Sequence, residues 1–194
     1  MSILDLMCKD SVSFSKNRCN TRINNTILHL GGHHNYLSCL YFDFPPYSCL
    51  KNLKNAKLIL FKLPMSQYKT FDSRCGSHRV YRHHYIVSPL LEFFSVYSYL
   101  YSVPKADYSK KMTFDDDVSL CYTEIDITGI VKEWIDDSME NRGLMLIGNH
   151  SNKLISYASE KNDIPRMCPI IRLIYKENTC WGLSSTPCLV EVKN

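Results

Sequence analysis

The chain has 194 residues, a formal net charge of +4 and nine cysteines, and 12% of its residues are aromatic. A chain of this length can bury the core of one domain, so no second domain is needed. No apolar run reaches the roughly 20 residues of a membrane-spanning helix, and we expect no transmembrane segment. The basic residues are spread without a basic stripe or a nucleic-acid-binding motif, which argues against a nucleic-acid partner.

Turn residues divide the first two thirds of the sequence into short strands. Pro45-Pro46 and Ser88-Pro89 each end a strand, because proline cannot donate to a β-ladder. Lys51, Lys54, Lys57 and Lys62 surround the third apolar run, where they indicate a solvated strand edge protected by lysines. The expected segments are 24–32 (a turn, a strand and a glycine stop), 36–44, 56–63, 80–87 and 118–127.

A short amphipathic helix follows at about 128–137. Thr128 is expected to be its N-cap, because a threonine hydroxyl can accept from the free amides of the first turn. Ile130, Val131, Trp134 and Ile135 fall on one helical face, which predicts an apolar stripe centred on a large indole. We expect Lys132, Glu133, Asp136 and Asp137 to face away from the core.

The segments after the helix complete the expected fold. Asn141-Arg142-Gly143 has turn chemistry, and Leu144 begins another strand. The run 170–175 is apolar on most of both faces, which predicts a strand inside a sheet and not at its rim. We predict an all-β, jelly-roll-type antiparallel β-sandwich with one short helix. Residues 1–23 form an N-terminal extension or a first strand, 24–175 the sandwich domain, and 176–194 a cysteine-containing tail.

The order of these elements resembles the DNRLRE-domain family, which comprises bacterial and archaeal surface β-sandwiches related to carbohydrate-binding modules. The resemblance extends over roughly residues 24–175. It implies a mostly non-catalytic jelly roll at a cell surface. The segments that carry it are Ser38–Phe44, Leu53–Phe61, Ile125–Trp134, Asn141–Leu144, Ser159-Glu160 and Pro169–Tyr175.

One stretch departs from the family pattern. The family usually carries Trp-Ser-Glu, then Thr-Trp and a proline, where this chain has Phe94-Ser95-Val96 and Leu100 to Pro104. Aromatic character survives here, so function is expected in the aromatic stretch 93–108. Sugars bind by stacking on aromatic rings, although packing in the core or at an interface is the alternative role. The candidate carbohydrate-binding residues are Tyr97, Tyr99, Tyr101 and Tyr108.

The carboxylates and histidines do not form a recognisable catalytic motif, so we predict that the protein is not an enzyme. The three consecutive aspartates predict a solvated loop tip or, as the alternative, a calcium site, since calcium prefers hard oxygen ligands. They are Asp115, Asp116 and Asp117. The doublets His33-His34 and His83-His84 read as surface histidines, with zinc or copper as an alternative. No organic cofactor is expected.

The nine cysteines contain no Cys-x-x-Cys pair, which argues against a zinc ribbon. Cys39 and Cys121 lie in apolar strand contexts, where a reduced thiol behaves as a small hydrophobe. Thiols nearer the ends are candidates for crosslinks between neighbouring chains. These are Cys8, Cys19, Cys180 and Cys188.

Two functions therefore stay open. The first is a surface module that binds carbohydrate or another cell-envelope polymer. The second is a self-associating subunit of a spore coat, envelope layer or filament, with other copies of the chain as partners. Asp5 and Lys9 interrupt the apolar stretch of a secretory signal. We expect a location at the cell or spore surface, reached after removal of a signal or by another export route.

Overall fold

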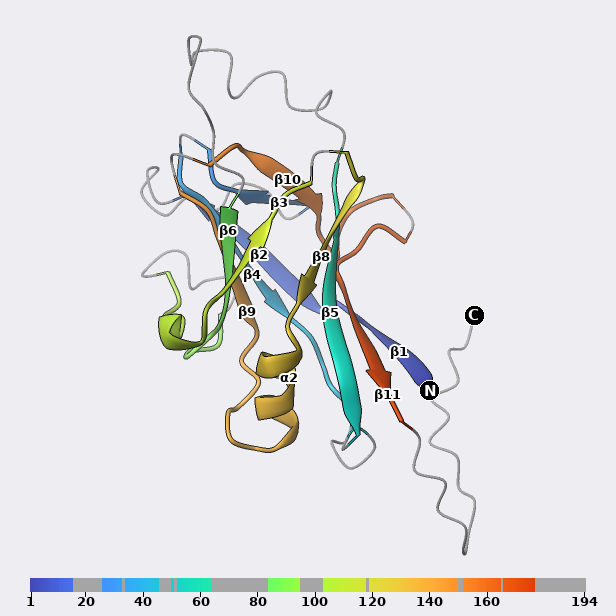
Figure 1. Ribbon diagram of the computed structural model, residues 1–194. Coiled ribbons are helices and arrows are strands. Elements are labelled where there is room, and N and C mark those ends of the chain that lie inside the picture. Colours follow the sequence, from blue (N-terminus) through green and yellow to red (C-terminus); the bar gives the residue numbers. More distant parts are fainter. Residues whose placement is uncertain are drawn as a thin grey trace, which may run out of the picture.

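The computed structural model describes residues 1–15, 26–32, 34–45, 50, 52–63, 84–94, 103–117, 119–149, 152–164 and 166–176. Strands dominate this part of the chain, and they pair in antiparallel sheets (Figure 1). Their bounds are β1 (Ser2–Met7), β2 (Asp10–Ser15), β3 (Ile27–Leu30), β4 (Tyr36–Tyr41), β5 (Leu53–Phe61), β6 (His84–Pro89), β7 (Met112–Asp115), β8 (Tyr122–Asp126), β9 (Leu144–Ile147), β10 (Ile155–Ala158) and β11 (Ile170–Tyr175). The helical elements are the α-helix α2 (Thr128–Ile135) and the 3-10 helix η3 (Tyr108–Lys110).

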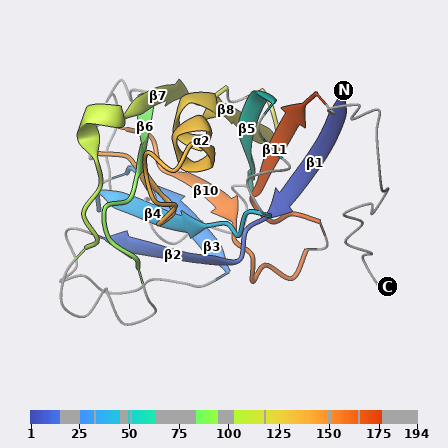
Figure 2. The same ribbon diagram turned by 90° about the horizontal axis from the view of Figure 1, so that it is seen from below.

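Two sheets form the layers of a sandwich. One has the strand order β1-β11-β5-β8, and the other has the order β2-β4-β9-β6-β7. Figure 2 shows the two layers from below, with α2 at the near end. The strands β1-β11-β5-β8 facing β4-β9-β6-β7 have the connectivity of an eight-stranded jelly roll. Strand β2 widens the second sheet, and β3 pairs with β10 at the end opposite α2.

The helix closes one end of the core between the sheets. Ile130, Val131, Trp134 and Ile135 are buried in the main hydrophobic cluster, and the Trp134 ring contacts Phe44 edge-on at a centroid distance of 5.4 Å. Burial of an isoleucine or valine side chain contributes about 1.5–3 kcal/mol to the free energy of unfolding. The described chain contains no helix long and apolar enough to cross a membrane.

The second sheet is apolar on its outer face as well. Val12, Leu37, Cys39, Met145 and Ile147 alternate with inward-facing residues and form a separate buried cluster. Described residues from 90–94 and 103–106, which follow β6 and are called here the covering segment, lie over this face. The covering segment contributes Leu90 and Ala106 to the buried cluster. Two further residues of the segment, Phe94 and Val103, are partly buried and pack against it.

The structure confirms the all-β sandwich and the interior position of β11, which pairs with β1 on one side and β5 on the other. Within residues 1–15, β1 and β2 are strands that pair with β11 and β4. Strand β7 was not predicted. The tail beyond Lys176 lies outside the described residues.

Two local predictions were wrong. Strand β5 lies between β11 and β8, so its lysines do not protect a sheet edge; Lys57 instead pairs with Glu124 on β8 at 2.7 Å. Thr128 is the first residue of α2 and not its N-cap. Its hydroxyl accepts from the backbone N of Ala56 at 2.9 Å, which ties the helix to β5. The turn into the helix is held by Asp126, whose carboxylate accepts from the Thr128 N at 2.9 Å.

A polar cluster is buried where β3 meets β2. The Ser13 hydroxyl accepts from the backbone N of His29 at 2.8 Å, and His29 Nδ1 lies 2.9 Å from the Ser156 hydroxyl. Burial lowers the pKa of His29 from 6.5 to about 4, because a charged imidazolium would lose its hydration there.

This burial predicts a pH-dependent loss of stability. Since the pKa of His29 is lower in the folded chain, the unfolded chain takes up the proton first, and stability should fall as pH drops from 6.5 towards 4. The contribution is about 3 kcal/mol in total. Urea unfolding between pH 7 and pH 4 should show a shallower fall for His29→Asn than for the natural chain. Parallel pH profiles would contradict the assignment, because carboxylates affect both proteins equally.

Candidate functional site

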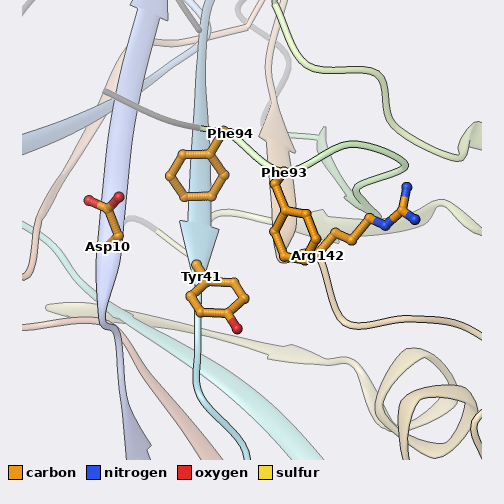
Figure 3. A pocket seen from close by; sticks show the side chains of 5 residues that line it. All are labelled: Asp10, Tyr41, Phe93, Phe94 and Arg142. Atoms are coloured by element: carbon orange, nitrogen blue, oxygen red, sulfur yellow. The ribbon is translucent and has the colours of Figure 1, made fainter. Parts of the chain in front are cut away.

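The principal candidate site is a hollow on the outer face of the second sheet. It has a volume of about 270 Å³ and is lined by Asp10, Tyr41, Phe93, Phe94 and Arg142 (Figure 3). We call this the aromatic hollow. Three aromatic rings with one carboxylate and one guanidinium give it both stacking surfaces and hydrogen-bonding groups.

The sheet register positions the first two residues. Asp10 at the start of β2 is the direct partner of Tyr41 at the end of β4. Both belong to the row that continues into the outer apolar cluster through Val12 and Cys39. The hollow therefore borders the buried cluster of the outer face.

A tight turn positions Arg142. The side chain of Asn141 donates to the Phe42 carbonyl at 2.8 Å and accepts from the Gly143 N at 3.1 Å. Gly143 has φ +99°, and a Cβ there would collide with the Leu40 carbonyl oxygen. The turn is thus held against the end of β4, directly before β9 begins at Leu144.

Arg142 connects this turn to the aromatic segment. Its Nη1 donates to the Leu91 carbonyl, and its guanidinium carbon lies 5.7 Å from the Phe93 ring centroid. This is a cation–π geometry. The Phe93 ring also contacts Tyr41 edge-on at 6.3 Å. Figure 3 shows Phe93 between these two residues.

The rings differ in exposure. Phe93 is 56% exposed, whereas Phe94 is partly buried and packs on the outer cluster. Large apolar rings that are this exposed commonly mark an interaction site when polar groups surround them. Phe93 is therefore the ring most available to a ligand, and Phe94 supports the covering segment.

None of the four tyrosines predicted to bind carbohydrate is among the described residues that line the aromatic hollow. Tyr97, Tyr99 and Tyr101 lie outside the described residues. Tyr108 begins η3 and is 52% exposed, but it does not line the aromatic hollow. Phe93 and Phe94 belong to the stretch in which function was expected, whereas Asp10, Tyr41 and Arg142 were missed as site residues. The alternation of Asp10, Val12 and Phe14 is visible in the sequence, but the pairing of Asp10 with Tyr41 is not.

The three consecutive aspartates hold three different partners. Asp115 pairs with His84 across β6 and β7, the largely buried Asp116 pairs with Lys62, and Asp117 accepts from the Ser119 N at 2.9 Å. The Ser119 bonds lower the pKa of Asp117. In the described ranges no three His, Cys, Asp or Glu side chains are grouped to hold a metal ion. Calcium binding here stays a prediction.

The exposure of two cysteines differs from what the sequence predicted. Cys8 is 6% exposed, and its thiol donates to the Asp10 carbonyl at 3.3 Å, so it does not offer the exposed thiol that a crosslink requires. Cys121 is exposed and precedes β8, although we expected it to be buried. Cys39 is buried as expected. Cys19, Cys180 and Cys188 lie outside the described residues.

Comparisons with known proteins leave the family open. Neither the models of known protein families nor the sequences of curated proteins match this chain. The resemblance to the DNRLRE-domain family accordingly stays a hypothesis.

Thiol labelling should separate these cysteines. Burial raises the pKa of both Cys8 and Cys39, whereas Cys121 is open to solvent. Under native conditions at pH 8, iodoacetamide should modify Cys121 at least tenfold faster than Cys8 or Cys39, measured by peptide mass spectrometry. Equal rates in the folded protein, with the same reagent in urea as the reference, would contradict the burial of the two inner thiols.

Proposed function

We propose that this protein is a non-catalytic β-sandwich module that binds carbohydrate or a related cell-envelope polymer through the aromatic hollow. The observation that carries the proposal is the exposed Phe93 ring beside Tyr41, with Asp10 and Arg142 at the same hollow. Apolar faces of sugar rings stack on such side chains, and sugar hydroxyls bond to the charged groups around them. The resemblance to surface modules supports the same function and a location at the cell or spore surface.

The chemistry of the lining residues favours binding over catalysis. Asp10 is the single carboxylate among the described lining residues. Glycoside hydrolysis usually needs two carboxyl groups about 5–10 Å apart on opposite sides of the bond. Asp10 is suited to accept hydrogen bonds from hydroxyls, since its described ion pair with Lys161 is long, at 3.7 Å.

Phe93→Ala should test this proposal. Removing the exposed ring should weaken binding about tenfold or more, because the stacking surface is lost while the sheet remains intact. A glycan array followed by calorimetry on the best polysaccharide measures the effect. Tyr108→Ala is the matched control, since that ring is 52% exposed but lies outside the hollow. Absence of binding to any polysaccharide, or an equal loss in both variants, would sink the proposal.

A second candidate function is self-association as a structural subunit. Strand β1 pairs with β11 alone among the described strands, so it is an edge of its sheet. Its outward row carries Ile3 and Met7, which are 64% and 56% exposed, and between them Asp5, which pairs with Arg172 of β11 at 2.8 Å. An edge strand with apolar outward side chains is a template for pairing with another chain. Here the proposed partner is β1 of a second copy, giving one continuous antiparallel sheet.

Ile3→Lys addresses this second candidate. A charge on β1 should shift a concentration-dependent dimer towards monomer in sedimentation or light-scattering measurements, because lysine discourages strand addition. Ile164→Lys is the control, as Ile164 is exposed but lies outside every strand. Gels with and without reductant show whether any association is covalent. A monomer at all concentrations would exclude this function.

A further inference from the structure

The charged side chains around the aromatic hollow are paired with one another. Arg142 donates through Nε to Glu140 at 2.7 Å, and its Nη2 lies 2.6 Å from the same carboxylate. Lys161 lies 3.7 Å from Asp10 and 3.3 Å from Glu160. The neighbouring Lys9 is paired with Asp43. Each of these three described cations therefore already has a carboxylate partner.

Among the described side chains, the ion pairs beside the hollow contain one more carboxylate than cations. The paired group contains the carboxylates of Asp10, Glu140 and Glu160 but the cations of only Arg142 and Lys161. Asp10 itself belongs to the lining, with its side chain 37% exposed. An anionic ligand would meet this carboxylate, while the described cations beside it, Arg142 and Lys161, already have carboxylate partners.

The N–H groups of Arg142 that an anion would engage already have partners within the protein. Recognition of a carboxylate or phosphate by arginine usually engages two parallel N–H groups of the guanidinium. In this chain Nε and Nη2 are directed to Glu140, and Nη1 donates to the Leu91 carbonyl. The guanidinium of Arg142 also lies over the Phe93 ring, which lines the hollow.

We propose that the aromatic hollow selects uncharged sugar units and discriminates against uronates and other anionic polymers. The inference rests on the carbohydrate-binding function proposed above and specifies its ligand class. A volume of about 270 Å³ lies just below the roughly 300–1,000 Å³ of small-molecule pockets, which suits contact with one or two rings of a longer chain. Asp10 accepts from ring hydroxyls, and Phe93 supplies the stacking face.

A chemically matched pair of polymers provides the test. The probe is the neutral polysaccharide that binds best on the array, and its partner is the same polymer with its primary alcohols oxidised to carboxylates. In 20 mM salt the oxidised polymer should bind about five- to tenfold more weakly. The difference should shrink in 300 mM salt, because exposed charges are then screened.

Glu140→Gln tests the origin of the selectivity. This change frees the guanidinium of Arg142 from its partner, so the oxidised polymer should bind several-fold more tightly than it does to the natural chain. Glu124→Gln is the matched control. It removes one carboxylate from an ion pair of 2.7 Å on the opposite sheet and should leave both affinities unchanged.

The outcomes separate the two proposals. A silent array removes the carbohydrate-binding function and this inference with it. If polysaccharides bind and Phe93→Ala weakens them, but acidic polymers bind as well as or better than neutral ones, only the selectivity is overturned. An equal gain for the oxidised polymer in Glu140→Gln and Glu124→Gln would show that overall charge, and not Arg142, controls the choice.

Discussion

Burial of the second sheet on both of its faces is the constraint on which the rest of the structure depends. Its inner face packs on the core between the sheets, while Val12, Phe14, Leu37 and Cys39 on its outer face also avoid water. Leaving such a patch open would cost several kcal/mol, since each of these side chains gains about 1.5–3 kcal/mol from burial. The chain after β6 must therefore fold back over the sheet.

The aromatic hollow lies beside the part of the outer face that these residues bury. Phe94 packs on the outer cluster, whereas its neighbour Phe93 stays largely exposed beyond the cluster. At the same end of the sheet the outward row changes from the apolar Cys39 to Tyr41. Packing thus brings aromatic and charged groups together at a border between a buried surface and water.

Arg142 couples the scaffold to this border. The turn around it is set by hydrogen bonds of Asn141 and by the positive φ of Gly143. From this fixed base its guanidinium reaches the Leu91 carbonyl and the Phe93 ring. Because Glu140 neutralises its charge, Arg142 contributes position and a flat surface more than electrostatic attraction. One short turn thus holds the scaffold and also places a residue that lines the aromatic hollow.

Local patterns in the sequence determined much of the architecture. The stripe formed by Ile130 and Trp134 predicted a helix on the core, and the two-sided apolar run of β11 predicted an interior strand, because both depend on residues close in the chain. Tertiary structure alone decided that Asp10 faces Tyr41, that β5 is central, and that Cys8 is buried. Strand register and sheet order join residues far apart in sequence, and no local pattern encodes which partner lies opposite. The sequence therefore predicted that the site would be aromatic, through the stretch that contains Phe93 and Phe94. The hollow itself forms only when the folded chain brings Asp10, Tyr41 and Arg142 to these rings.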